Sequence, residues 1–371
     1  MRRMLGILAG IAALAATTAD ARELRIAPGA PPAHPSHSHL YSKLAELLPE
    51  VSGGNLTAQV LGPEVVGLGQ MKEGLQSQLV EIGNLLPLYF PADLPNMSLA
   101  GELALSGREP HAMAAAMTEY MVTCDTCQEE LKKFGVTYLG SGSSDVYALL
   151  TNKPVRTAED VKGLRLRSGG APFSRWAEHF GAVPANIGVG DTFESMSQGV
   201  IDGSMASIGD LLSFRLVELV KNITFVPLGT YHATSDFTVA NTTWESLSAE
   251  ERKQLATAAN EANVIFTQRW GYEMAAEAKA AAEKAGIEFV EPDPAFVEAV
   301  EAFAEADKET AAKVSQERFG FADAAERVAR FSNLVEKWTG IVKEANSDPQ
   351  EIAKRLDEEV WSKVDFETYG M

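Results

Sequence analysis

Two arginines on one short predicted strand are the side chains best suited to recognise an anion. They stand in the run Leu164-Arg165-Leu166-Arg167, and a glycine-bearing loop follows. A guanidinium presents a rigid fork of donors that matches the two oxygens of a carboxylate. Alternate residues of a strand share a face, so spacing alone does not choose between Arg165 and Arg167. The pattern predicts that one of them is a carboxylate receptor.

A second motif, Gly199-Val200-Ile201-Asp202-Gly203, lies further along the chain. We expect its Asp-Gly turn to reach the same sheet edge as the end of the arginine strand, where open α/β folds bind their ligands. Met205 and Ser207 follow the turn directly, and they are therefore candidate ligand contacts.

The two cysteines of the chain, Cys124 and Cys127, form a C-x-x-C motif. Such a motif indicates redox chemistry, half of a zinc site, or a short disulfide. No second cysteine pair accompanies it. The motif favours a structural disulfide that pins a helix turn, and a redox role is the alternative.

His34, His37 and His39 place three imidazoles within one proline-rich loop. Their spacing matches no known zinc motif, and no cysteine or H-E-x-x-H stands nearby. We expect solvent-facing loop histidines, with His34 on the lip of a cleft, and neither a metal nor a cofactor. The sequence also lacks G-x-S-x-G, so a secreted hydrolase is disfavoured and we predict that the protein is not an enzyme.

The first 21 residues read as a secretory signal peptide. A basic start at Arg2 and Arg3 precedes an apolar stretch and the cleavage pattern Ala19-Asp20-Ala21. The mature chain would begin near Arg22, and no later stretch has the roughly 18 to 20 apolar residues of a membrane span. The expected location is the periplasm.

Composition narrows the class of partner. The chain has 371 residues, 46% of them hydrophobic and 22% charged, with a formal net charge of −19. It is long enough for two domains with full cores. A strongly acidic body repels nucleic acid and anionic lipid, so an anionic ligand would need a local receptor that acts against the overall field.

Alternating strand and helix patterns predict a parallel sheet near the N-terminus. Its third strand runs into an aromatic loop that contains Leu86 and Tyr89. The predicted strands are 23–27, 56–61, 80–86, 136–139, 145–151, 164–167, 183–187, 222–228 and 236–240. The predicted helices are 40–48, 70–78, 109–134, 157–162, one through Trp176 and Phe180, one capped by Asp191, and 208–220.

The longest helical pattern runs from Ser248 to Gly286 without a proline. Ser248 and Glu251 form a capping box at its start. At 1.5 Å per residue such a helix spans roughly 55 Å, which is too long for one small domain. The apolar stripe of this helix continues on a displaced face through Phe266, Trp270 and Met274, with Gly271 at the change. We predict a helix shared by two lobes with a bend near Gly271, followed by a helical tail that could cap the lobes or form a homodimer interface.

Four segments together resemble the solute-binding subunits of tripartite ATP-independent periplasmic (TRAP) transporters of the DctP type. They are Lys153-Pro154-Val155-Arg156-Thr157-Ala158-Glu159-Asp160-Val161-Lys162-Gly163 with the arginine strand, Phe180-Gly181-Ala182-Val183-Pro184, the 199–203 motif, and Trp244 before Leu247. The resemblance covers Glu23 to at least Gly286. It implies a periplasmic-binding-protein-like α/β fold with a central cleft. Lobe I would comprise 22–144 and 234–271, lobe II 145–233 and 272–325, and a helical extension 326–371.

The resemblance also implies a role for one arginine. In this family the arginine that ends the strand pairs with the substrate carboxylate, and Arg167 holds that position. Members that bind sialic acid or C4-dicarboxylates carry a second arginine where this chain has Tyr147, and an asparagine where it has Ala206. The expected ligand is therefore a monocarboxylate with an apolar or aromatic body. The further candidate contacts are Phe173, Trp176, Tyr89, Tyr147 and Met205, and each aromatic could equally belong to the core.

As a TRAP receptor, the protein would close on the acid, with ligand contacts from the lobe I loops near His34 and from Leu86 to Tyr89. It would then pass the acid to the small and large membrane subunits of a symporter. The hinges would lie near Asp145, Ala233 and Gly271. A C4-dicarboxylate ligand is one alternative, and a binding protein of an ABC importer is another. The long shared helix argues against the ABC class.

Overall fold

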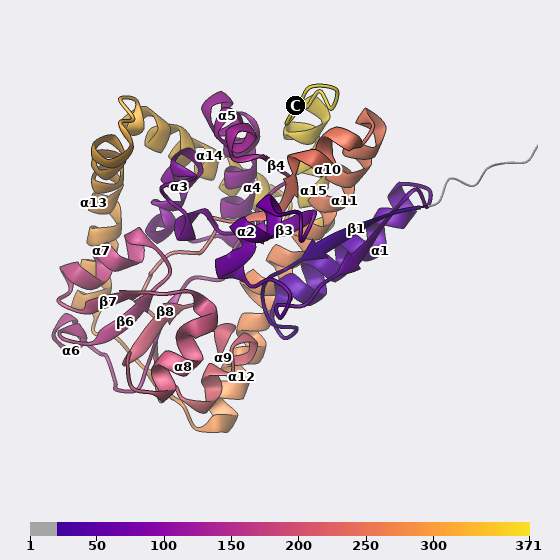
Figure 1. Ribbon diagram of the computed structural model, residues 1–371. Helices are drawn as coiled ribbons and strands as arrows, with labels where there is room; N and C mark the ends of the chain where they lie inside the picture. The colour runs from indigo at the N-terminus through magenta and orange to yellow at the C-terminus, as the bar shows by residue number, and fades with distance from the viewer. Residues whose placement is uncertain (1–20) are drawn as a thin grey trace, which may run out of the picture.

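The computed structural model describes residues 21–371 and contains two β-sheets, each flanked by helices (Figure 1). We refer to the part built on the first sheet as lobe I and to the part built on the second as lobe II. This is the two-lobed α/β fold predicted from the sequence. Apart from Ala21, the predicted signal peptide lies outside the described residues. None of the described helices combines the length and the apolar character needed to span a bilayer.

The sheet of lobe I has the strand order β2-β1-β3-β10-β4. Strands β1, β2 and β3 are parallel, as the alternating pattern predicts, and β10 returns from lobe II to pair antiparallel with β3 and β4. The strands are β1 (Arg22–Ala27), β2 (Leu56–Val60), β3 (Ile82–Leu85), β4 (Val136–Tyr138) and β10 (Ser235–Ala240). The helices between them are α1 (Ser42–Val51), α2 (Met71–Gln76) and α3 (Pro95–Gly101), and a π-helical segment (Ser36–Tyr41) leads into α1.

The sheet of lobe II has the strand order β11-β9-β5-β8-β6-β7. Strands β6, β7 and β8 are parallel, whereas β5 is antiparallel to β8 and β9. The strands are β5 (Ala148–Thr151), β6 (Arg165–Ser168), β7 (Val183–Asn186), β8 (Gly203–Ala206), β9 (Asn222–Thr224) and β11 (Glu288–Val290). The helices are α6 (Ala158–Val161), α7 (Ala171–His179), α8 (Thr192–Ser197) and α9 (Asp210–Ser213).

The predicted helix over 109–134 is two helices, α4 (Pro110–Val122) and α5 (Asp125–Phe134). The break falls at Thr123 and Cys124. Cys124 is extended and caps α5, where its sulfur accepts from the backbone N–H of Cys127. A disulfide joins Cys124 to Cys127. The helical periodicity continues across the break, which is why the sequence pattern did not reveal it.

Three other predictions in lobe II were wrong. The helix over 208–220 is interrupted, because Arg215 adopts the left-handed region at φ 59° between α9 and a short 3₁₀ turn. Asp191 makes no side-chain cap, since a 3₁₀ turn (Val189–Asp191) leads into α8. The strand over 222–228 ends at Thr224, the last residue of β9 that pairs with β11.

The long helix predicted after Ser248 is present, and its Ser248–Glu251 capping box forms. It comprises α11 (Ala249–Gln268), a π-helical segment (Arg269–Glu273) and α12 (Met274–Ala285). The helix runs from lobe I into lobe II (Figure 1), packing on α1 and α4 in the first and on α9 in the second. The π-helical segment coincides with the change of apolar face at Gly271.

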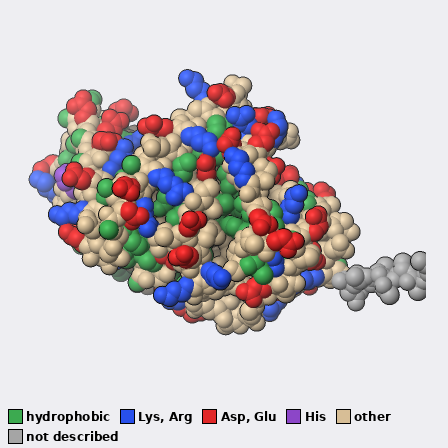
Figure 2. Space-filling view, turned by 90° about the horizontal axis from the view of Figure 1, so that it is seen from above, with side chains coloured by type: hydrophobic (Ala, Val, Ile, Leu, Met, Phe, Trp, Pro, Cys, Tyr) green, Lys and Arg blue, Asp and Glu red, His purple; other side chains and the backbone are tan. Residues whose placement is uncertain are grey.

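The C-terminal part is helical, as predicted. Helix α13 (Pro294–Phe319) contacts α3 of lobe I and α7 of lobe II, α14 (Ala324–Glu344) packs along α4, and α15 (Pro349–Glu359) packs on α11. The short helix α10 (Asn241–Ser246) follows β10. Seen from above, acidic and basic side chains are interspersed over the surface rather than gathered by sign (Figure 2).

Candidate functional site

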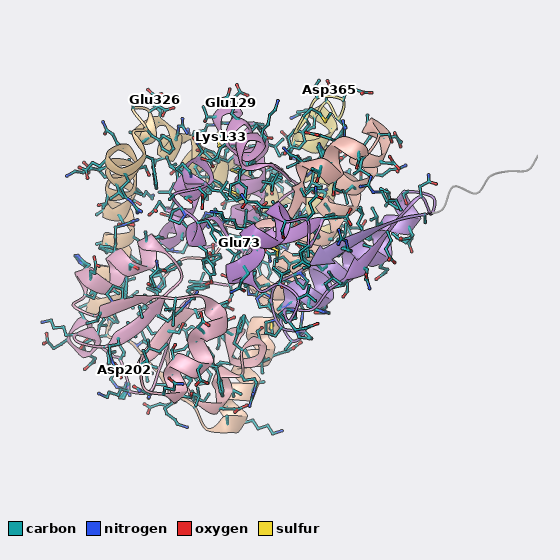
Figure 3. The ribbon with its side chains drawn as sticks, in the orientation of Figure 1. Glu73, Glu129, Lys133, Asp202, Glu326 and Asp365 are labelled. Carbon is teal, nitrogen blue, oxygen red and sulfur yellow. A yellow bond between two sulfur atoms is a disulfide. The ribbon has the colours of Figure 1, made fainter. Side chains whose placement is uncertain are left out.

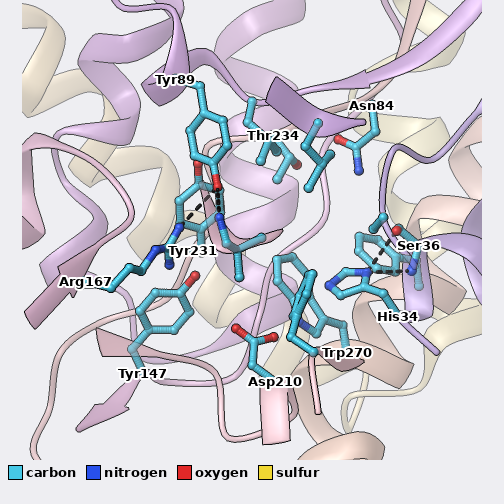
Figure 4. A pocket seen from close by; sticks show the side chains of 16 residues that line it. His34, Ser36, Asn84, Tyr89, Tyr147, Arg167, Asp210, Tyr231, Thr234 and Trp270 are labelled. Carbon is cyan, nitrogen blue, oxygen red and sulfur yellow. Dashed lines mark hydrogen bonds between the residues drawn. The ribbon is translucent and has the colours of Figure 1, made fainter. Parts of the chain in front are cut away.

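A small cavity of about 40 Å³ is lined by residues of both lobes and of the long helix (Figure 4). Most of its side chains are buried. They are Ala30, His34, Ser36, Leu68, Asn84, Leu86, Tyr89, Tyr147, Arg167, Val189, Asp210, Phe214, Tyr231, Thr234, Phe266 and Trp270. The cavity therefore brings together segments that are far apart in the sequence.

Arg167 extends into this cavity from β6 and is only 1% exposed. Its Nε donates to the carbonyl of Ile187 at 3.1 Å, and its Nη2 donates to the hydroxyl of Tyr89 at 3.1 Å. Nη1 is buried and has no hydrogen-bond partner among the described residues. Burial alone would lower the pKa of Arg167, but Tyr89, Tyr147 and Asp210 raise it above its usual value. The guanidinium is therefore charged and has a free donor.

Three tyrosines surround this guanidinium. The hydroxyl oxygen of Tyr89 accepts from Arg167 and, at 3.0 Å, from the backbone N–H of Val189, so its own hydrogen is free to donate. Tyr147 and Tyr231 stack with ring centroids 6.1 Å apart, and burial raises the pKa of both well above 10. The hydroxyl of Tyr231 is buried without a partner. Neutral hydroxyls beside a charged guanidinium form a donor-rich end that suits a carboxylate.

The cavity is apolar further from Arg167. Trp270 stacks on Phe266 with ring centroids 5.1 Å apart, and His34 lies edge-on to Trp270 at 5.4 Å. Phe214 lies 5.7 Å from the ring of His34. These rings offer a flat apolar surface to the body of a ligand.

The protonation of His34 is set by its neighbours. Its Nδ1 accepts from the backbone N–H of Ser36 at 3.1 Å and also contacts the Ser36 hydroxyl at 2.8 Å. Burial lowers the pKa of His34 to about 3. The ring is therefore neutral with its hydrogen on Nε2, which points toward the middle of the cavity (Figure 4). The expected position on the lip of a cleft was wrong, because His34 is buried inside.

Asp210 is an acidic group in the same cavity and is 3% exposed. It begins α9. Burial raises the pKa of this carboxyl to about 7, with Asp145 acting in the same direction and Arg167 in the opposite one. Within residues 21–371 no hydrogen-bond donor reaches either carboxylate oxygen of Asp210.

The structure distinguishes the two arginines of β6. Arg165 lies at the start of the strand, where it is exposed and makes a two-pronged ion pair with Asp202 at 2.8 and 2.9 Å. Leu166 is opposite Gly203 in the parallel β6–β8 pair, so the Asp-Gly turn starts β8 at the end away from Arg167. Asp202 accordingly lies at the outer end of lobe II (Figure 3). The prediction that the turn and Arg167 share one edge was wrong, because a strand start and a strand end lie at opposite edges.

Five of the residues predicted to bind ligand line the cavity: Arg167, Tyr147, Tyr89, Leu86 and His34. Met205, Ser207, Phe173 and Trp176 do not. Met205 points into the apolar core with Leu149, and the Ser207 hydroxyl accepts from the N–H of Gly209 at 3.0 Å.

The two aromatic side chains of α7 belong to the core as well. Phe173 stacks behind Tyr147 at 5.1 Å, and Trp176 packs against Phe180 at 4.8 Å. Phe173 and Trp176 are three residues apart, and Phe180 follows Trp176 by four. This spacing is that of the inward face of a helix, which explains why these side chains are buried.

Sequence reasoning missed several cavity residues. Phe266 and Trp270 were recognised only as an apolar stripe of the long helix, although their four-residue spacing placed them side by side. Tyr231, Asp210 and Asn84 carried no local signal, because each reaches the cavity only through the pairing of distant strands. No three metal-binding side chains converge on a common point in the part of the chain that the structure describes.

Comparisons with known proteins agree with this geometry. The model of bacterial extracellular solute-binding protein family 7, DctP, matches residues 26–315. A sialic acid-binding periplasmic protein of Vibrio cholerae is 24% identical over 143 residues, which are 38% of this chain and 43% of that protein. A solute-binding protein of Albidiferax ferrireducens is 32% identical over 79 residues, 21% of this chain and 23% of that protein. The chain thus matches less than half the length of these relatives.

Solved structures share the fold over most of both chains. A TRAP periplasmic solute-binding protein of Bordetella bronchiseptica with bound (R)- and (S)-mandelate has a TM-score of 0.74 and 22% identity, covering 85% of this chain and 99% of that one. A marine metagenome TRAP solute-binding protein specific for aromatic acids, in complex with 3-hydroxybenzoate, has a TM-score of 0.77 and 23% identity, covering 86% and 99%.

Proposed function

Because the chain belongs to family 7 of the bacterial extracellular solute-binding proteins, the DctP family, we propose that it captures a small organic monocarboxylate for a TRAP-type transporter. The family is the one predicted from the sequence. It is a class of binding proteins, which fits the prediction that the protein is not an enzyme. Delivery to small and large membrane subunits, and action in the periplasm, are parts of this proposal.

The observation that carries the proposal is the unpaired Nη1 of Arg167. A buried guanidinium without a carboxylate partner is costly to hold in a protein interior, so an anionic ligand that pairs with it is stabilised strongly. The hydroxyls of Tyr89 and Tyr231 add donors beside it. Each charge-assisted hydrogen bond contributes roughly 1.5 to 3 kcal/mol.

The rest of the cavity supports a ligand with one carboxylate. Arg167 is the one arginine or lysine among the described lining residues, and Tyr147 stands where a second arginine was expected for dicarboxylates. Asp210 would repel a second carboxylate. The aromatic surface of Trp270 and Phe266 suits an apolar or aromatic body, like the mandelate and 3-hydroxybenzoate held by the structural relatives.

Closure of the two lobes would accompany binding. Tyr89 of lobe I bonds to Arg167 and Val189 of lobe II, so the two lobes meet at the cavity. A ligand larger than this small cavity enters only if the lobes separate. We place the hinges where the chain crosses near Asp145 and Ala233 and at the π-helical segment of the long helix. Closure is favoured only by contacts made in the closed form and absent from the open one.

The test is a ligand screen followed by one substitution. Purified protein is screened by thermal shift against monocarboxylates and dicarboxylates, because a ligand that binds the folded state raises the melting temperature. Arg167→Ala should weaken the best ligand at least about tenfold in calorimetry, with the ligand-free melting temperature nearly unchanged. Equal affinity for the wild type and the variant would refute the assignment.

A further inference from the structure

Asp210 is the cavity residue that a plain carboxylate receptor does not need. A carboxylate ligand on Arg167 would share the small cavity with the carboxyl of Asp210, which is largely removed from water. The carboxyl of Asp210 has an oxygen that can accept a hydrogen bond, and a ligand carboxylate has no hydrogen to donate to it. The position of Asp210 is therefore explained by a donor group of the ligand other than its carboxylate.

The surroundings of Asp210 provide no hydrogen bond for its side chain. The backbone carbonyl of Asp210 accepts from the N–H of Phe214 at 3.0 Å, but no described residue donates to the side-chain oxygens. Figure 4 shows the carboxylate directed into the cavity, between Tyr147 and Trp270. The side chain of Asp210 is 3% exposed and accepts no hydrogen bond from the described residues, so a ligand that supplies a donor adds one.

His34 supplies the complementary group. Since Nδ1 of His34 is used by Ser36, its Nε2–H is a donor that faces the same cavity. A ligand group that serves both side chains must donate to Asp210 and accept from His34. A hydroxyl does both, whereas an ammonium has no lone pair with which to accept.

Resting on the proposed function, we propose that this receptor selects hydroxy acids, in which the carboxylate pairs with Arg167 and a separate hydroxyl donates to Asp210 and accepts from His34. Asp210 then determines specificity rather than overall affinity. Both ionisation states of the side chain keep an oxygen that accepts, so the assignment does not depend on which is present.

The test uses matched ligands in which one substituent changes. The sets are mandelate, phenylacetate and phenylglycine; 3-hydroxybenzoate, benzoate and 3-(aminomethyl)benzoate; and lactate, propionate and alanine. Dissociation constants are measured by calorimetry for the wild type, Asp210→Leu and Asp236→Asn. The last variant is a control, because Asp236 is buried like Asp210 but does not line the cavity.

In at least one set, the hydroxy acid should bind the wild type roughly 10-fold to 100-fold more tightly than the unsubstituted acid, as expected for a hydrogen bond to a charged group. Asp210→Leu should reduce that ratio to within about threefold, and Asp236→Asn should preserve it. Circular dichroism establishes that each variant is folded, and if Asp210→Leu does not fold, Asp210→Ala and His34→Phe are measured instead. His34→Phe should also reduce the ratio.

Three results would overturn the inference while leaving the proposed function intact: equal affinity for hydroxylated and unsubstituted acids, a preference for the ammonium-bearing member, or a hydroxyl preference that survives in Asp210→Leu. If no carboxylate of any set binds the wild type, the proposed function itself fails, and the inference fails with it.

Discussion

Lobe II contains two arginines with opposite surroundings, the buried Arg167 and the partly buried Arg175. Arg175, on α7, donates to both oxygens of Asp307 at 2.7 Å and to Glu102 at 2.5 Å. Arg167, on the neighbouring strand β6, has a backbone carbonyl and a tyrosine hydroxyl as its partners, and its Nη1 is unpaired. The protein thus supplies carboxylate partners for the guanidinium of Arg175 and none for that of Arg167.

The comparison separates a structural arginine from a binding arginine. Arg175 links three segments, because Glu102 follows α3, Asp307 lies on α13 and Arg175 itself lies on α7. Its ion pairs are internal, so an external anion has nothing to gain there. Among the described residues Nη1 of Arg167 has no partner, so an anion from outside can pair with it. For these two arginines, the unpaired charged donor distinguishes the binding residue from the structural one.

The sharpest test of this comparison is Arg175→Met. Removing one partner of a buried ion-pair cluster leaves two buried carboxylates unpaired, which should lower the free energy of unfolding by about 3–5 kcal/mol. Chemical denaturation at neutral pH measures the change. Arg167→Met is the matched control and should leave the ligand-free stability equal or higher. If Arg167→Met destabilises the protein as much as Arg175→Met, the distinction is wrong.

Asp236 is a buried carboxyl that, unlike Asp307 and Glu102, is not paired with an arginine in the described residues. Burial raises the pKa of Asp236 to about 8, so between pH 4 and pH 8 this side chain holds more protons in the folded chain than in the unfolded chain. Its contribution to the free energy of unfolding should therefore fall as pH rises through this range. Asp236→Asn should remove this contribution, which amounts to roughly 3 to 4 kcal/mol between pH 5 and pH 8.

Denaturant titrations at several pH values measure this slope in the wild type and in Asp236→Asn. Burial also raises the pKa of Asp145 and of Asp210, each to about 7, and lowers that of His34, His111 and His232. These groups titrate in both proteins, so the difference between the two slopes isolates Asp236. An unchanged slope in Asp236→Asn would contradict the assignment.

Tyr89→Phe tests the bond between the lobes with a smaller change. The variant keeps the ring but removes the acceptor for Arg167 and for the N–H of Val189. One hydrogen bond to a charged group and one neutral bond are lost, and water replaces both in the open form. We expect the ligand to bind about 5-fold to 20-fold more weakly. The variant also removes the hydroxyl hydrogen proposed to donate to the ligand carboxylate. Calorimetry measures the combined effect, and an unchanged affinity would show that Tyr89 acts neither in closure nor in binding the carboxylate.

Arg165→Ala should have the smallest effect. Arg165 is exposed at the outer edge of lobe II and pairs with Asp202. Exposed ion pairs contribute little, and the cavity lies at the other end of the strand. Ligand affinity should stay within twofold of the wild type in calorimetry. A tenfold loss of affinity would mean that the anion binds at the Arg165 end of β6, which would contradict the assignment of Arg167 as its receptor.

The sequence predicted the fold because its strongest local signals agree with the tertiary structure. The capping box predicted at Ser248 forms, and the parallel start of lobe I follows from its alternating pattern. The helix predictions that failed are those in which the backbone conformation of one residue interrupts a continuous helical periodicity. Arg215 takes a left-handed conformation and Cys124 an extended one, and neither residue type announces this.

The binding site was less predictable than the fold. Arg167 was identified because a family motif marks the end of its strand, while alternation left Arg165 equally eligible. Phe173 and Trp176 had the correct residue type but face the core of lobe II. Asp210 was missed because its place beside Arg167 depends on the pairing of β8 with β6 and on the turn after β8, neither of which a linear pattern encodes.

The π-helical segment Arg269–Glu273 fixes the rotational phase between the two halves of the long helix. Trp270 stands within it, so the widened turn also aims an aromatic wall of the cavity. A π turn holds one residue more than an α turn, so it accommodates an additional residue without the rotation of roughly 100° that a residue adds to an ordinary α-helix. Helix α12 therefore keeps the phase in which it packs on α9. The widened turn thus absorbs one residue of length at the midpoint of the longest helix while the contacts on both sides of it are kept.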